Sequence, residues 1–216
     1  MAIFSFILAG ATLRDRLVAC TGALIGIALT AWVSAIGVGM DAAVLIVAPM
    51  GASAVLIFAV PASPLAQPWP VIAGNTLSAL VGVAVAALVP VPAVAAGMAV
   101  ALAILLMSLT RSLHPPGGAA ALLAVVGGAE VAAAGWTFAI VPVALNAVIL
   151  AAVGVLFHRV SGHNYPHRPL ALPLAHPEDV DRALEDLGET LDVDRADIDR
   201  LLVRVQHHAG MRARRR

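Results

Sequence analysis

The strongest constraint on this chain is the near absence of charge between Leu17 and Phe157. The only formal charges in that stretch are Asp41, Arg111 and Glu130. A charge inside hydrocarbon costs several kcal/mol, so long uncharged apolar runs are typical of membrane-spanning segments. Over the whole chain 61% of residues are apolar and 12% are charged, against about 25% charged in soluble domains. The sequence predicts an integral membrane protein, with the lipid bilayer and no nucleic acid among its partners.

Six apolar segments follow one another in this part of the chain. They are Leu17–Gly37, Ala42–Val60, Val71–Val89, Ala93–Leu109, Pro116–Val126 and Trp136–Phe157. A helix of about 20 residues spans a hydrocarbon core of ~30 Å, so the pattern predicts an all-α bundle of about six helical segments. The chain is expected to cross the membrane six times, or four times if the two segments that Pro and Gly interrupt, Ala42–Val60 and Pro116–Val126, are re-entrant.

The distribution of charge also predicts the domains and their orientation. Residues 1–160 form a transmembrane domain, and residues 161–216 form a cytoplasmic tail with two short helices, at about 177–187 and 195–208. Lys and Arg favour cytoplasmic flanks of membrane spans. Both termini are therefore expected in the cytoplasm, with the protein in a bacterial inner membrane.

The sequence Leu113–Leu123 interrupts the apolar pattern with a histidine, two prolines and two glycines. Proline suits the first helical turn and glycine allows close approach to the backbone, so this stretch predicts a half-helix N-terminus that attracts anions. Arg111 adds a fixed cation, and His114 is the one nearby residue type with an ordinary pKa near neutral pH, so it is the candidate for coupling anion entry to a proton. The residues expected to bind an anion are Arg111, His114, Pro115, Pro116, Gly117, Gly118, Pro49, Gly51, Ser53, Asn75 and Asn146.

Two of the apolar segments resemble each other. Pro49–Val60 aligns without gaps on Pro115–Val126, and the same offset of 66 residues places the third segment on part of the sixth. This indicates a possible 3+3 internal repeat of helix, Pro/Gly-broken segment and helix. Paired interrupted segments in two halves point to a transport site near the bilayer midplane.

Each of these residues also has a purely structural interpretation. Arg111 would then only anchor the topology, and His114 would cap a helix or pack in the core. Asn75, Asn146 and Ser53 would make hydrogen bonds between helices. The glycines and alanines would then serve close helix packing.

The membrane domain lacks the residue patterns that catalysis needs. It contains no paired carboxylates, phosphate-binding loop or metal-spaced His/Cys cluster. The tail histidines His163, His167, His207 and His208 are interpreted as solvated polar residues rather than as metal ligands. We expect no enzyme activity, no catalytic residue, no metal and no cofactor.

Several blocks of the sequence resemble one known family. Ser112–Ala121 resembles the signature of the HPP family of integral membrane proteins, and its other blocks have counterparts in Ala48–Leu56, Phe58–Pro68 and Gly74–Gly82. The similarity covers roughly Arg14–Arg168. It implies a bundle of about four transmembrane helices and, from plant-plastid and cyanobacterial members, a role in nitrite transport.

Together, the residues and the resemblance predict a small membrane transporter or channel for a small inorganic, nitrite-like anion. A protein of this size is expected to work as a homo-oligomer. The alternative is a membrane regulatory or scaffold protein that transports nothing and acts through its cytoplasmic tail.

Overall fold

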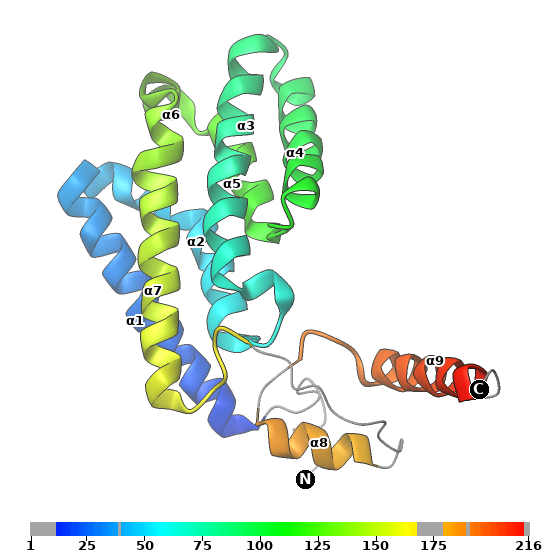
Figure 1. Ribbon diagram of the computed structural model, residues 1–216. Coiled ribbons are helices and arrows are strands. Elements are labelled where there is room, and N and C mark those ends of the chain that lie inside the picture. The colour runs from blue at the N-terminus through cyan, green and yellow to red at the C-terminus, as the bar shows by residue number, and fades with distance from the viewer. Residues whose placement is uncertain (1–11, 39, 168–178, 189–190, 214–216) are drawn as a thin grey trace.

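The computed structural model describes residues 12–38, 40–167, 179–188 and 191–213. Every regular element in those residues is helical, which confirms the predicted all-α class (Figure 1). The α-helices of the membrane domain are α1 (Leu13–Val38), α2 (Met40–Ala59), α3 (Asn75–Leu88), α4 (Pro92–Leu109), α5 (Pro115–Val126), α6 (Gly128–Ala134) and α7 (Leu145–Ser161).

Three short helical turns complete the domain. The π-helical turns η2 (Pro70–Gly74) and η3 (Ala139–Ala144) lead directly into α3 and α7 and lengthen them. The proline-rich segment between α2 and η2, residues 61–69, contains the 3₁₀ turn η1 (Pro64–Ala66). We call residues 61–69 the connector.

By length and composition, four helical stretches in the described residues can cross a membrane. These stretches are Leu13–Ile36, Pro70–Leu88, Pro92–Leu109 and Ala139–Ser161. α5 and α6 meet at a bend of 97° and form either a fifth span or a re-entrant turn. The expected 3+3 repeat remains a prediction.

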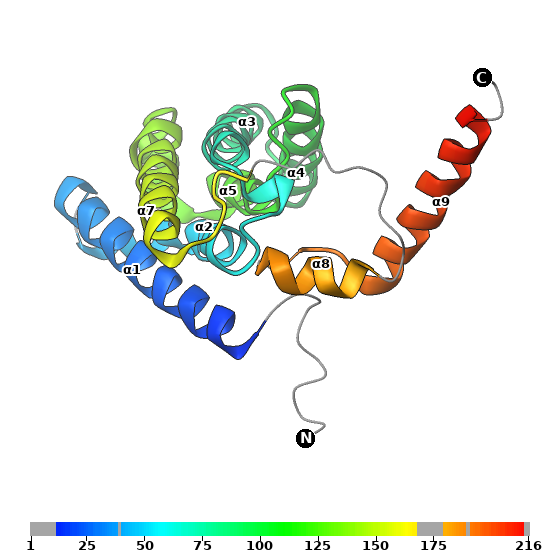
Figure 2. The same cartoon turned by 60° about the horizontal axis from the view of Figure 1, so that its bottom comes forward.

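The helices form two packed groups that lie side by side (Figures 1 and 2). α3, α4 and α5 pack on one another, and α1 packs on α2 and α7. In α4 the buried positions recur every fourth residue, at Ala95, Ala99, Ala103 and Met107. Small side chains at this spacing let helices approach closely, which is how membrane helices gain packing energy without a hydrophobic effect between them.

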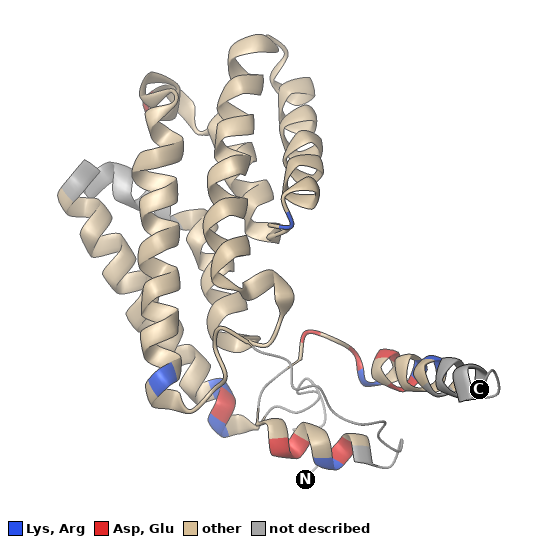
Figure 3. Cartoon of the chain, in the orientation of Figure 1, with Lys and Arg blue, Asp and Glu red and all other residues tan. Residues whose placement is uncertain are grey.

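The charged residues of the membrane domain that the structure describes lie at the ends of its helices and at one turn (Figure 3). Arg14 and Arg16 lie in the first turns of α1, Arg159 lies in the last turn of α7, and these two helix ends are at the same end of the domain. Glu130 lies in α6 at the opposite end. This separation agrees with the predicted cytoplasmic termini, and the orientation itself remains a prediction.

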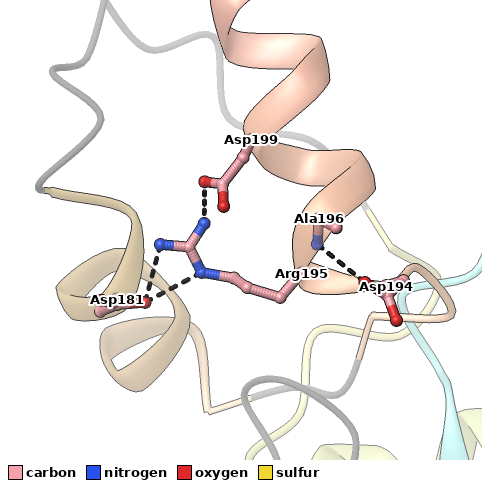
Figure 4. Close-up of polar contacts among 5 residues, drawn as sticks. All are labelled: Asp181, Asp194, Arg195, Ala196 and Asp199. Atoms are coloured by element: carbon pink, nitrogen blue, oxygen red, sulfur yellow. Dashed lines mark hydrogen bonds and ion pairs between the residues drawn. The ribbon is translucent and has the colours of Figure 1, made fainter.

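The tail contains the two predicted helices, α8 (Asp179–Leu187) and α9 (Arg195–Ala213). The expected helix start near Pro177 lies outside the described residues. α8 buries Val180 and Leu184. Arg195 at the start of α9 forms ion pairs with Asp181 of α8 and with Asp199 one turn further along α9 (Figure 4).

Gly82 tests the close packing of α3 on α5. A methyl group at this position would lie 2.7 Å from the Cβ of Ala124 and would also contact the backbone oxygen of Ala121. We expect Gly82→Ala to lower the free energy of unfolding by about 1–3 kcal/mol, because overpacking forces helices apart. The measurement is thermal unfolding in detergent.

Gly97 in α4 is the matched control, since a methyl group there meets no atom within 4 Å. Alanine favours the helix over glycine, so Gly97→Ala should unfold at or above the parent temperature. Equal losses from both substitutions would contradict the packing argument.

Candidate functional site

His114 lies immediately before α5, with an extended backbone and a fully buried side chain. Its Nε2 lies 2.8 Å from the hydroxyl of Ser53 in α2, and its Nδ1 lies 2.8 Å from the carbonyl oxygen of Leu65 in the connector. A carbonyl only accepts, so Nδ1 carries the hydrogen and Nε2 of the neutral ring accepts from Ser53. The two partners therefore select one neutral tautomer.

Asn75 extends this arrangement to a third helix. Its amide nitrogen lies 3.3 Å from Oγ of Ser53 and donates to the carbonyl of Val71 at 2.8 Å. Ser53, Asn75 and His114 are all fully buried. The bonds run in one direction, from Asn75 through Ser53 and His114 to Leu65, and we call these four residues the His114 network.

Pro49 and Gly51 lie beside the network but do not break α2. The segment Pro49–Ser53 was predicted as an interruption, whereas α2 is one helix from Met40 to Ala59 with Pro49 inside it. Membrane helices tolerate proline because neighbouring groups satisfy the backbone that proline releases. The hydroxyl of Ser53, one turn after Pro49, lies 3.4 Å from the Pro49 carbonyl.

The predicted half-helix begins at Pro115, as the sequence indicates. Most of the backbone N–H groups in its first turn are either missing or already hydrogen-bonded, so few remain for an anion. Pro115 and Pro116 have no N–H, and the amide of Gly117 donates to the His114 carbonyl at 2.8 Å. Gly117 also packs tightly, because a Cβ there would lie 2.7 Å from the Ser78 hydroxyl and 2.8 Å from the Gly74 carbonyl. Gly117 thus fits the packing interpretation, and the anion-binding role of Gly117 and Gly118 remains a prediction.

In α3 and α7, three buried side-chain polar atoms have no hydrogen-bond partner among the residues that the structure describes. They are Oδ1 of Asn75, Oγ of Ser78 and Nδ2 of Asn146. Asn75 and Ser78 lie one helical turn apart in α3. Buried polar atoms without a partner cost about 1–3 kcal/mol each, so each points to a bound molecule or to another conformation.

Asn146 and Arg111 lie outside the His114 network. Asn146 in α7 accepts from the hydroxyl of Ser34 in α1 and forms a second buried polar pair. Arg111 lies in the turn between α4 and α5, is exposed and adopts a left-handed backbone conformation with φ of 53°. Its guanidinium makes no ion pair with any residue described.

The sequence did not indicate that the connector belongs to the site. Besides the bond from His114, the connector accepts a hydrogen bond from the Tyr165 hydroxyl to Ala66 O at 2.8 Å. Gln67 bonds with its amide to the carbonyls of Pro61 and Ser63, and with its oxygen to the His167 amide. The prolines signal an irregular segment, but no local pattern identifies partners about 50 and 100 residues away.

The profile of the HPP transmembrane region matches residues 9–166. The chain belongs to the HPP family. His114, Pro115 and Pro116, whose one-letter codes spell that name, join the network to the first turn of α5. The resemblance inferred from the sequence blocks is thereby confirmed.

Two relatives of this HPP protein are transmembrane proteins of Dictyostelium discoideum. One is 49% identical over 109 residues, which are 49% of this chain and 38% of that protein. The other is 48% identical over 103 residues, which are 46% of this chain and 33% of that protein. The matched region therefore covers less than two fifths of either relative. No solved structure matches the chain.

Ser53 tests the His114 network. Ser53→Ala leaves Nε2 of the buried His114 without a donor, so we expect a loss of about 1–3 kcal/mol in the free energy of unfolding. The same substitution should perturb the ¹⁵N chemical shifts of the His114 ring, which report its tautomer. Thermal unfolding and NMR of ¹⁵N-histidine-labelled protein are the measurements.

Ser108→Ala is the matched control, because the exposed Ser108 hydroxyl bonds to the carbonyl of Ile104 within its own helix. Surface substitutions of this kind change stability by about 0.5 kcal/mol or less. Equal effects of the two substitutions on stability, with unchanged His114 shifts, would disprove the network.

Proposed function

We propose that the membrane domain of this HPP protein transports a small inorganic anion, such as nitrite, as a transporter or channel. The proposal is supported by buried polar side chains from α2, α3 and α7, and by His114 just before α5, in a domain otherwise made of apolar helices. Polar groups at membrane depth are expensive and mark functional sites by default.

The observation that carries the proposal is that two buried donors, one in α3 and one in α7, are unused. The hydroxyl of Ser78 and the side-chain amide of Asn146 are buried, and neither has an acceptor among the described residues. An oxyanion without its hydration shell needs donors, which these groups supply without charge. A neutral donor set also lets the anion leave again, which transport requires. Asn75 Oδ1, an acceptor, would pair with water that accompanies the anion.

In this proposal His114 responds to protons rather than binding the anion. Both ring nitrogens already have partners. A second proton, on Nε2, would change that atom from acceptor to donor, and the Ser53 hydrogen would have to turn away. The Ser53 hydroxyl would then donate to the Pro49 carbonyl, which lies 3.4 Å from Ser53 Oγ. In this proposal, protonation replaces the hydrogen bond between α2 and His114, and this change would couple anion movement to protons.

Arg111 is the residue expected to concentrate the anion at the α4–α5 turn. Because an exposed cation raises the local anion concentration, Arg111→Gln should lower nitrite uptake into proteoliposomes by up to about tenfold at low ionic strength, and less at high salt. Uptake is measured with and without a pH gradient, against empty vesicles.

Arg182→Gln in α8 is the control, since Arg182 is an exposed arginine of the tail. It should leave uptake unchanged. Uptake that ignores Arg111 would reduce that residue to a topology anchor. Absence of uptake for nitrite, nitrate, formate and chloride by folded protein would disprove anion transport.

Removal of residues 179–216 distinguishes transport from signalling through the tail. The deletion keeps every hydrogen bond of the His114 network and the bond from Tyr165 to Ala66. A transporting membrane domain should therefore retain the uptake rate of the parent. If parent protein shows no uptake and the deletion instead abolishes binding of a cytoplasmic partner, the regulatory or scaffold alternative holds.

A further inference from the structure

α1 and α7 form a long groove along the outside of the domain. The two helices lie side by side, and the start of α1 is at the same end as the finish of α7 (Figures 1 and 2). The groove has a volume of about 710 Å³, and its wall is almost entirely apolar. Leu17, Ile25 and Leu29 line it from α1, and Val153 and Leu156 line it from α7.

The length of this apolar wall corresponds to one leaflet of a bilayer. With a rise of 1.5 Å per residue, Leu17 and Leu29 lie about 18 Å apart along α1. One leaflet of a ~30 Å hydrocarbon core is about 15 Å deep. Since Leu17, Leu29 and Leu156 are exposed, a fatty acyl chain can lie along this wall within the leaflet that adjoins the start of α1.

One end of the groove is cationic. Arg14 lines the groove there, is exposed, and forms no ion pair within the described part of the chain. The neighbouring carboxylate, Asp15, accepts hydrogen bonds from the amide and hydroxyl of Thr12 at 2.7 Å. Ser161, also at this end, already bonds to the ring nitrogens of two histidines. The charge of Arg14 is therefore available to an anion.

We propose that the α1–α7 groove binds an anionic glycerophospholipid, with one acyl chain along the apolar wall and the phosphate against Arg14. Basic pockets between membrane helices bind anionic headgroups, and each Arg near the surface adds about fivefold in affinity. The chemistry requires both parts, because the wall recognises only hydrocarbon and the arginine only charge. This site is independent of the anion path proposed above.

A second copy of the chain fits the groove less well. Copies in one membrane share their orientation, so a two-fold contact through this groove would place Arg14 opposite its own counterpart at the same depth. Arg16 and Arg159 lie at the same end of the domain and would add to the repulsion. A lipid phosphate would offset the positive charge at the Arg14 end of the groove, whereas a second copy of the chain would bring more positive charge to it.

The test is lipid binding to the full-length protein in detergent, measured by native mass spectrometry. Phosphatidylglycerol and phosphatidylcholine with identical acyl chains are titrated separately. We expect phosphatidylglycerol to bind the parent about fivefold more tightly. Arg14→Gln should abolish this preference and weaken phosphatidylcholine binding less than phosphatidylglycerol binding, because the choline cation offsets the charge of its phosphate.

Two further variants distinguish lipid binding in the groove from attraction to surface charge in general and from adsorption to the apolar surface that detergent covers. Arg159→Gln removes an exposed cation at the same end that does not line the groove, and should keep the preference. Thr21→Trp, or Leu156→Trp if the first does not fold, fills the groove and should weaken binding of both lipids. Folding of each variant is checked by thermal unfolding.

Three results would overturn the proposal. They are equal binding of the two lipids by the parent, equal loss of preference from Arg14→Gln and Arg159→Gln, and unchanged binding by the folded tryptophan variant.

Discussion

The hydrogen bonds of His114 join α2, the connector and the start of α5 by pairing polar groups that are buried between them. Irregular backbone at membrane depth is tolerated only when protein groups pair with it. The His114 ring supplies the donor for Leu65 in the connector, and the His114 carbonyl accepts the amide of Gly117 in α5. Pro115 and Pro116 remove two further donors from the helix end. The His-Pro-Pro sequence therefore starts α5 with few backbone donors left unpaired.

The position of the His114 network depends on two glycines, Gly74 and Gly117, at which helices pack through their backbones. A Cβ at Gly74 would lie 2.6 Å from the Ser112 carbonyl and 2.7 Å from the Cβ of His114. At Gly117 it would meet Ser78 and Gly74 at similarly short distances. Because nothing intervenes, η2 and the start of α5 touch through backbone. Apolar helices are not driven together by water inside a bilayer, so this close contact is what fixes the polar groups.

The sequence predicted the helices well and the site only in part. Apolar runs about 20 residues long and flanking prolines mark spans directly, and Pro115 marked the start of α5. Ser53, Asn75 and His114 were predicted as site residues, and they do come together. The interruption predicted at Pro49 was wrong, because proline breaks an isolated helix but not one that neighbouring helices stabilise. The connector was missed because its partners bind backbone carbonyls, which every residue has and no sequence pattern distinguishes.

The connector gives the site and the segment after α7 a common structural element. His114 bonds to the carbonyl of Leu65, and Tyr165 bonds to the carbonyl of the next residue, Ala66. Burial raises the pKa of the Tyr165 phenol, which keeps it a neutral donor. Because the two carbonyls belong to adjacent residues, a displacement of the connector would act on both bonds. A ligand that binds one arrangement of the connector more tightly than another would therefore change the His114 bond and the Tyr165 bond together. The proposed transport and a signal through the tail are thus compatible functions.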